Sequence, residues 1–74
     1  TSMGTFIKVH FGSHALLNDA LGLGKNSVSR RYNDDPRRFF MYIQQLKKFS
    51  NVSLEDLVEM IEQRVEDVDA LKSW

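Results

Sequence analysis

The sequence predicts an all-α fold, a compact bundle of four to five short helices. Apolar residues recur at intervals of three and four in two long stretches, residues 39–49 and 54–68, and this spacing forms one face of a helix. Residues that favour helix ends stand at the borders of these stretches. With 74 residues and an apolar fraction of 42%, the chain can build one small core and is near the lower size limit for doing so.

The first segment, residues 5–11, is compatible with two structures. Ile7, Val9 and Phe11 alternate as in a strand, whereas Ile7 and Phe11 also stand four residues apart as in a helix. The residue pattern leaves both open. The two residues before the first methionine resemble an expression remnant, so we exclude them and start the domain at residue 3.

Two short helices are predicted next, joined by a tight turn. Ser13 is a favoured N-cap for a helix over residues 14–21. Gly22 is placed to end that helix in the left-handed conformation. After a turn of about three residues, a second helix is expected over residues 25–32. Two short helices with a glycine-containing turn between them form the helix-turn-helix unit.

The rest of the chain is predicted to form two more helices. Asp35 and Pro36 favour a helix start over residues 36–49, because Asp caps helices and Pro is tolerated at the first helical position. Asn51 ends that helix, and Ser53 caps a last one, with Asp56 at the capping-box distance. The last helix carries a heptad-like apolar stripe, formed by Leu54, Val58, Ile61, Val65 and Val68. The core is expected to contain Leu17, Leu21, Val28, Phe39, Ile43, Leu46, Leu54 and Leu57.

The net charge of zero conceals a division between the two parts of the chain. Residues 1–50 hold eight basic and three acidic side chains, a net charge of +5, whereas residues 51–74 hold two basic and seven acidic ones, a net charge of −5. Such asymmetry suggests one side that faces a polyanion and one that is turned away from it. Ordinary solvated surface charge would give the same count.

The second of the two short helices has the side chains of a DNA-reading helix. The major groove of B-DNA is about 12 Å wide and admits one α-helix. With Val28 and Tyr32 facing inward, the helical turn of about 100° per residue directs Asn26, Arg30 and Asn33 outward. Asn and Arg side chains hydrogen-bond base edges and phosphates. A merely solvated helix would show the same pattern.

Residues 11–33, FGSHALLNDALGLGKNSVSRRYN, resemble the phage repressor and Cro family of DNA-binding domains. The resemblance continues through residues 39–49 and 52–57. It implies a lambda-repressor-like bundle with a short helix over residues 5–11. It also implies a set of site roles. The expected base contacts are Lys25, Asn26, Ser29 and Arg30, and the expected phosphate contacts are His14, Arg31 and Asn33.

Within this set, Asn26 and Arg30 are expected to provide sequence discrimination, and Lys25 and Asn33 more general affinity. Two positions depart from the family pattern. Asn18 stands where the bracing helix usually has a small residue, and Arg31 stands where the reading helix usually has an apolar one. These changes predict either a looser contact between the two helices or an Arg31 side chain turned toward a phosphate.

Other functions have weaker support in the sequence. His10 and His14 stand four apart, but Gly12 breaks the helix between them and no cysteine completes a tetrahedral metal site. Asp34 and Asp35 are neighbours on an exposed turn and do not form a catalytic pair. We therefore expect no catalytic residues, no metal, no cofactor and no small-molecule substrate. The alternatives kept open are a protein-interaction module on the same fold and, less favoured, single-stranded nucleic-acid binding.

The sequence thus predicts a transcriptional regulator of phage or mobile-element type that binds double-stranded DNA, and it leaves open whether this regulator is a repressor or an activator. Residues 3–62 are expected to form the helix-turn-helix domain, and residues 63–74 a C-terminal extension of the last helix that can serve homodimerisation. No apolar run approaches the roughly 20 residues of a membrane span, so no membrane partner is expected. The absence of cysteine suits a reducing cytoplasm.

Overall fold

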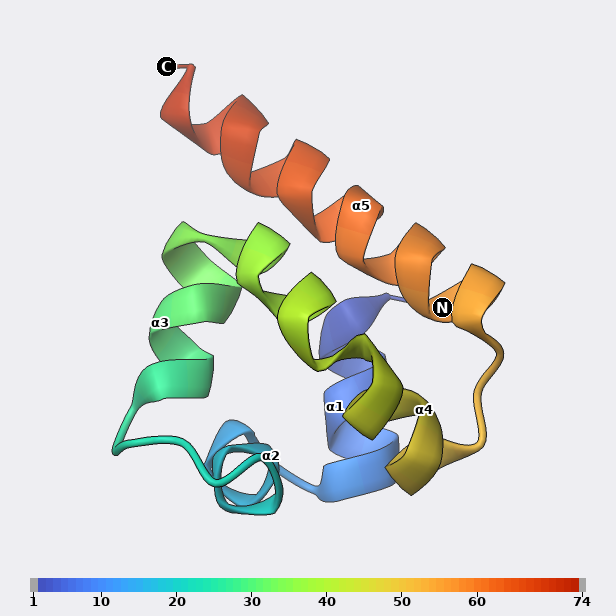
Figure 1. The fold of residues 1–74 in the computed structure, drawn as a ribbon. Helices are drawn as coiled ribbons and strands as arrows, with labels where there is room; N and C mark the ends of the chain where they lie inside the picture. The colour runs from blue at the N-terminus through green and yellow to red at the C-terminus, as the bar shows by residue number, and fades with distance from the viewer. Residues whose placement is uncertain (1, 74) are drawn as a thin grey trace.

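The computed structural model describes residues 2–73, which are all-helical and contain no strand (Figure 1). The elements in chain order are α1 (Met3–Phe11), α2 (His14–Ala20), α3 (Ser27–Asp34), the 3-10 helix η1 (Pro36–Tyr42), α4 (Ile43–Ser50) and α5 (Leu54–Lys72). The all-α prediction is confirmed. The last helix has 19 residues and continues past residue 62. No helix among the described residues is long and apolar enough to cross a membrane.

The predicted capping residues act as expected at three helix ends, whereas the side chain of Asp35 makes no cap hydrogen bond at the start of η1. The hydroxyls of Ser13 and Ser53 accept hydrogen bonds of 3.2 Å from the backbone amides of Leu16 and Asp56. Each bond satisfies one of the amides that a helix N-terminus leaves without a partner. Gly22 adopts a left-handed conformation after α2. Asn51 does the same at the end of α4, where its amide bonds to the Lys47 carbonyl.

Helix α1 resolves the ambiguity of the first segment. Met3, Phe6 and Ile7 are its buried residues, and their spacing of three and four is the inner face of a helix. The Ser2 hydroxyl accepts a hydrogen bond from the Thr5 amide and caps this helix. Excluding residue 2 from the fold was therefore wrong, because its side chain belongs to the helix end.

Two predicted helix boundaries are wrong. Helix α3 begins at Ser27, so Lys25 and Asn26 lie in the turn before it. Asn26 has a φ of 64°, a left-handed conformation that stops the helix from starting earlier. The predicted helix over residues 36–49 is divided into η1 and α4, which meet at Tyr42 and Ile43.

The core receives at least one buried residue from each of the six helical elements, and it includes most of the predicted residues. Phe39 of η1 is fully buried. Leu21 and Ile43 pack on the core only partly. Leu54 is exposed and its prediction is wrong, because the first residue of α5 lies at the edge of the molecule. The buried apolar residues are Met3, Phe6, Ile7, Leu17, Val28, Phe39, Leu46, Leu57, Met60, Ile61 and Val68.

Helix α5 packs its apolar stripe against its own domain and reaches back to α3. Ile61 and Val68 are buried. The Arg64 Nε donates a 2.9 Å hydrogen bond to the Tyr32 carbonyl, and its guanidinium lies 4.1 Å from the centre of the Tyr32 ring. Near the end of α5, the Lys72 amine donates to the Asp34 carbonyl at 2.8 Å. These contacts fix the C-terminal end of α3 on the long helix.

Candidate nucleic-acid interface

Helices α2 and α3 are neighbours joined by residues 21–26 (Figure 1), so the predicted turn of about three residues is wrong and the connection has six. The turn contains two left-handed residues, Gly22 with a φ of 67° and Asn26 with a φ of 64°. Glycine adopts this conformation without steric cost, and Asn is among the few other residues that tolerate it. Two sharp changes of direction within six residues allow α3 to leave the turn as a separate short helix beside α2.

Asn18 of α2 links the turn to the start of α3. Its side chain is only 6% exposed. The Nδ2 group donates to the Leu23 carbonyl at 3.0 Å, and the Oδ1 atom accepts from the Val28 amide at 3.2 Å. Asn26, at the N-cap position of α3, makes no side-chain cap hydrogen bond. Asn18 therefore provides, from the neighbouring helix, the cap hydrogen bond that α3 lacks. It also tightens the contact between α2 and α3, which the sequence predicted to be looser.

His14 and Ser29 form a second polar link between the two helices. The His14 Nδ1 atom lies 3.1 Å from the Ser29 hydroxyl, and the His14 ring lies 4.7 Å from that of Tyr32. Both His14 and Ser29 are half-buried. His14, a predicted phosphate contact, and Ser29, a predicted base contact, thus contact each other. Their contact holds α3 on α2.

Lys25 and Asn26 stand exposed at the tip of α3. Together with His14 and Ser29 they line a hollow of about 400 Å³ between α2 and α3. Asp19 lines the same hollow, so one carboxylate lies among the groups predicted to meet DNA. Four of the seven predicted site residues are therefore brought together here.

The other side of α3 carries the remaining predicted arginines. Arg30 is exposed, and Arg31 is half-buried with its guanidinium 5.7 Å from the centre of the Tyr42 ring. The Arg31 Nη1 atom is buried without a hydrogen-bond partner. Both arginines line a second hollow of about 330 Å³, which also contains Ser27, Asp34, Asp35 and Arg38. Asn33 is exposed but lines neither hollow.

Two residues of this surface were absent from the predicted site. The sequence contained a signal for Asn18. It is a polar residue on the inner side of one helix, and the helix that follows has no cap of its own. Arg38 belongs to the basic part of the chain, but its place beside Arg30 depends on how η1 follows α3. Its Nε group bonds to an oxygen of Asp35 at 3.2 Å.

The surface is polar and only weakly positive. The two hollows hold four cationic side chains and three carboxylates, a local net charge of +1. The cations are Lys25, Arg30, Arg31 and Arg38, and the carboxylates are Asp19, Asp34 and Asp35. Binding to a polyanion on this surface must therefore rely on the placement of hydrogen-bond donors as well as on charge.

Comparison with family models, curated proteins and solved structures gave no match. The resemblance to the phage repressor and Cro family therefore stays a prediction from the sequence. The roles of the site residues, which that resemblance implies, likewise stay predictions.

Proposed function

We propose that this chain is a sequence-specific double-stranded DNA-binding domain in which α2 and α3 act as a helix-turn-helix. In this proposal α3 enters the major groove and α2 braces it. The role of such a domain would be transcriptional regulation, in the manner of a phage or mobile-element repressor.

The observation that carries the proposal is a short helix, α3, whose inner side is packed against the fold and whose outer side is exposed to solvent. Val28 is fully buried, and the Asn18 and His14 contacts hold α3 on α2. Arg30 and Asn33 on the outer side are exposed. A reading helix needs this combination, because side chains must be held in a fixed register before they can distinguish base edges.

The dimensions of α3 also suit the proposal. A helix of eight residues is about 12 Å long at a rise of 1.5 Å per residue. Such a helix can lie in a major groove about 12 Å wide, with its N-terminal tip closest to the bases. Lys25 and Asn26 are located at that tip.

The proposed division of roles follows from side-chain chemistry. Arg30 can form a bidentate pair with guanine, and Asn26 with adenine. Lys25 is a flexible point charge and Asn33 lies near the C-terminal end of α3, so both are assigned to general affinity. Arg31 is assigned to phosphate, since it is a half-buried cation that lines the same hollow as the exposed Arg30.

A homodimer through α5 remains a prediction of this proposal. A dimer would present two α3 helices about 34 Å apart, one turn of DNA. Of the predicted stripe, Ile61 and Val68 are buried inside the protomer, whereas Leu54 and, beyond the stripe, Leu71 are exposed. The sequence also predicts that Leu71 and Trp74 extend the stripe, and Trp74 lies outside the described residues. Sedimentation of the chain with and without duplex DNA will give the stoichiometry.

The proposal is tested by selecting bound sequences from a random duplex pool. We expect the wild-type chain to enrich a recurring motif and Arg30→Ala to lose preference at one base position within it. Lys48→Ala is the matched control, because Lys48 is an exposed cation of α4 that lines neither hollow. A pool that shows no enrichment after repeated rounds would exclude sequence-specific DNA binding.

A further inference from the structure

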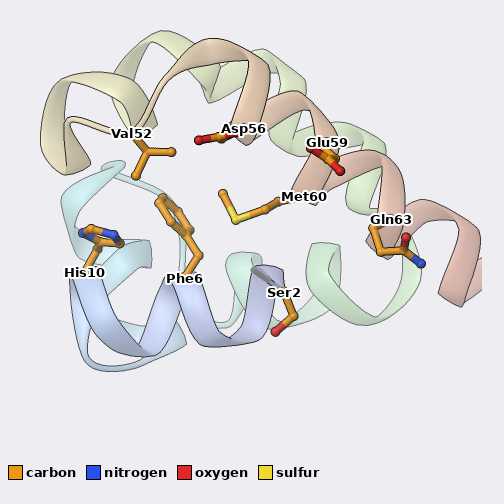
Figure 2. Close-up of a pocket in the computed structure, with 8 residues that line it drawn as sticks. All are labelled: Ser2, Phe6, His10, Val52, Asp56, Glu59, Met60 and Gln63. Carbon is orange, nitrogen blue, oxygen red and sulfur yellow. The ribbon is translucent and has the colours of Figure 1, made fainter.

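A groove separates α1 from the first half of α5, away from the candidate nucleic-acid interface. Figure 2 shows α1 on one side and the start of α5 on the other. The groove has a volume of about 490 Å³ and contains no residue of the two hollows beside α3. Its lining residues are Ser2, Phe6, His10, Val52, Asp56, Glu59, Met60 and Gln63.

The floor of the groove is apolar. Phe6 and Met60 point toward each other across it (Figure 2), and Val52 closes one end. Phe6 and Met60 are 3% and 6% exposed, so the floor is continuous with the core. The His10 ring lies 4.9 Å from the ring of Phe6 and extends the aromatic wall along α1. The apolar side chains that line this floor are Phe6, Met60 and Val52.

The rim of the groove on α5 is acidic. Asp56 and Glu59 are three residues apart on one helix and both are exposed, so their carboxylates are neighbours that repel each other. Neither carboxylate takes part in an ion pair or hydrogen bond within residues 2–73. The facing rim holds Ser2 and His10 and contributes no lysine or arginine. A cation bound at the rim would relieve this repulsion.

We propose that the groove binds a peptide segment of a partner protein in which lysine or arginine flanks a large apolar side chain. The apolar side chain would lie on Phe6 and Met60, and the flanking cations would pair with Asp56 and Glu59. Opposite charges across an interface raise the association rate and reject partners of the wrong sign. The same carboxylates repel nucleic acid, so DNA is not the occupant.

The shape of the groove favours a peptide. On the α1 side the lining runs from the N-cap residue Ser2 to His10, which is about 12 Å along a helix. The groove is thus an elongated trough between two helices, and a segment of several residues can lie along it. Because the groove and the α3 surface share no residues, the two can be occupied at the same time. The proposal does not depend on DNA binding.

The test is a selection of dodecapeptides from a displayed random library on the immobilised full chain. Parallel selections use the double variant Asp56→Lys, Glu59→Lys and the matched control Glu62→Lys, Glu66→Lys. The control reverses two exposed carboxylates of the same helix that do not line the groove. Thermal melting of both variants checks that they fold, which is expected because all four side chains are exposed.

We expect the wild-type chain and the control to enrich peptides with lysine or arginine around one large apolar residue. Their affinity for the double variant should be at least about tenfold weaker. In amide chemical-shift mapping, such a peptide should perturb residues of α1 and of the first half of α5 and leave α3 unchanged. Peptides without a basic bias, equal binding to the double variant, or shifts centred on α3 would each overturn the proposal. A self-association of the chain that Glu59→Lys abolishes would also overturn it, because a second copy would then occupy the groove.

Discussion

Helix α3 and helix α5 are held in the fold by different means. Helix α3 has eight residues and one buried side chain, Val28, and polar contacts from Asn18 and His14 fix its position. Helix α5 has 19 residues and four buried apolar side chains, so burial of apolar surface dominates its attachment. The short helix is therefore more sensitive to the loss of individual hydrogen bonds, and the long helix to the loss of apolar volume.

The same contrast applies to charge. The α3 surface mixes cations and carboxylates within two hollows, whereas the exposed side of α5 is predominantly acidic. Its two basic side chains, Arg64 and Lys72, both point back to α3. The acidic part of the sequence thus corresponds to the exposed side of α5, whereas the α3 surface carries only a small positive excess.

The largest expected effect is a loss of stability from α5. Ile61→Ala removes a fully buried side chain and should lower the free energy of unfolding by about 2–5 kcal/mol. In a domain of this size, that loss can abolish folding. Denaturant melts of this variant and of Leu71→Ala, an exposed residue of the same helix, give the comparison. Equal melting of the two variants would contradict the role assigned to the α5 stripe.

The next effect is local to α3. Asn18→Ala leaves the Leu23 carbonyl and the Val28 amide without partners and should cost about 1–3 kcal/mol. Amide hydrogen exchange should accelerate in α3 and in the turn before it, while the amides of α5 stay protected. A uniform acceleration across both helices would show that Asn18 supports the whole fold instead of the bracing of α3.

A smaller effect is expected at the tip of α3. Lys25→Ala should weaken binding to all duplexes by a similar factor and reduce the slope of log affinity against log salt by about 1. Titrations at several salt concentrations on a selected and a scrambled duplex measure both quantities. A loss confined to the selected duplex would reassign Lys25 to base reading.

The smallest effect is expected from the ion pair between η1 and α5. Arg37 and Asp69 meet at 2.9 Å, but their side chains are 61% and 50% exposed. Exposed pairs of this kind contribute about 0–1 kcal/mol. Arg37→Ala should therefore change the melting temperature little. A drop similar to that of Asn18→Ala would show that this polar contact, and not apolar burial, fixes the end of α5.

The sequence predicted the helix ends whose signals are local. Ser13, Ser53 and Asn51 act within their own helix or turn, so neighbouring residues were sufficient. The start of α3 was missed because its cap comes from Asn18, ten residues before Val28. Sequence spacing did not reveal that Asn26 would be left-handed and end the turn there.

Packing between distant segments could not be predicted either, because the interacting residues are far apart in the sequence. The groove forms from residues of α1 and α5 that are about 50 positions apart in the chain, and no periodicity within either segment signals it. The half-buried positions of His14 and Ser29 also depend on how α2 and α3 approach each other. Exposure of Arg30 and Asn33 was predicted, because it follows from the position of Val28 on a single helix.

The central claim, that α3 reads DNA sequence, is tested most directly by a binding comparison on two duplexes. Wild-type protein and Arg30→Ala are titrated against a selected duplex and a scrambled duplex of the same composition. We expect the wild type to prefer the selected duplex, and Arg30→Ala to lose about 1–3 kcal/mol on it with little change on the scrambled one. Equal affinity of the wild type for both duplexes would contradict the claim. An equal loss on both would reduce Arg30 to a phosphate contact.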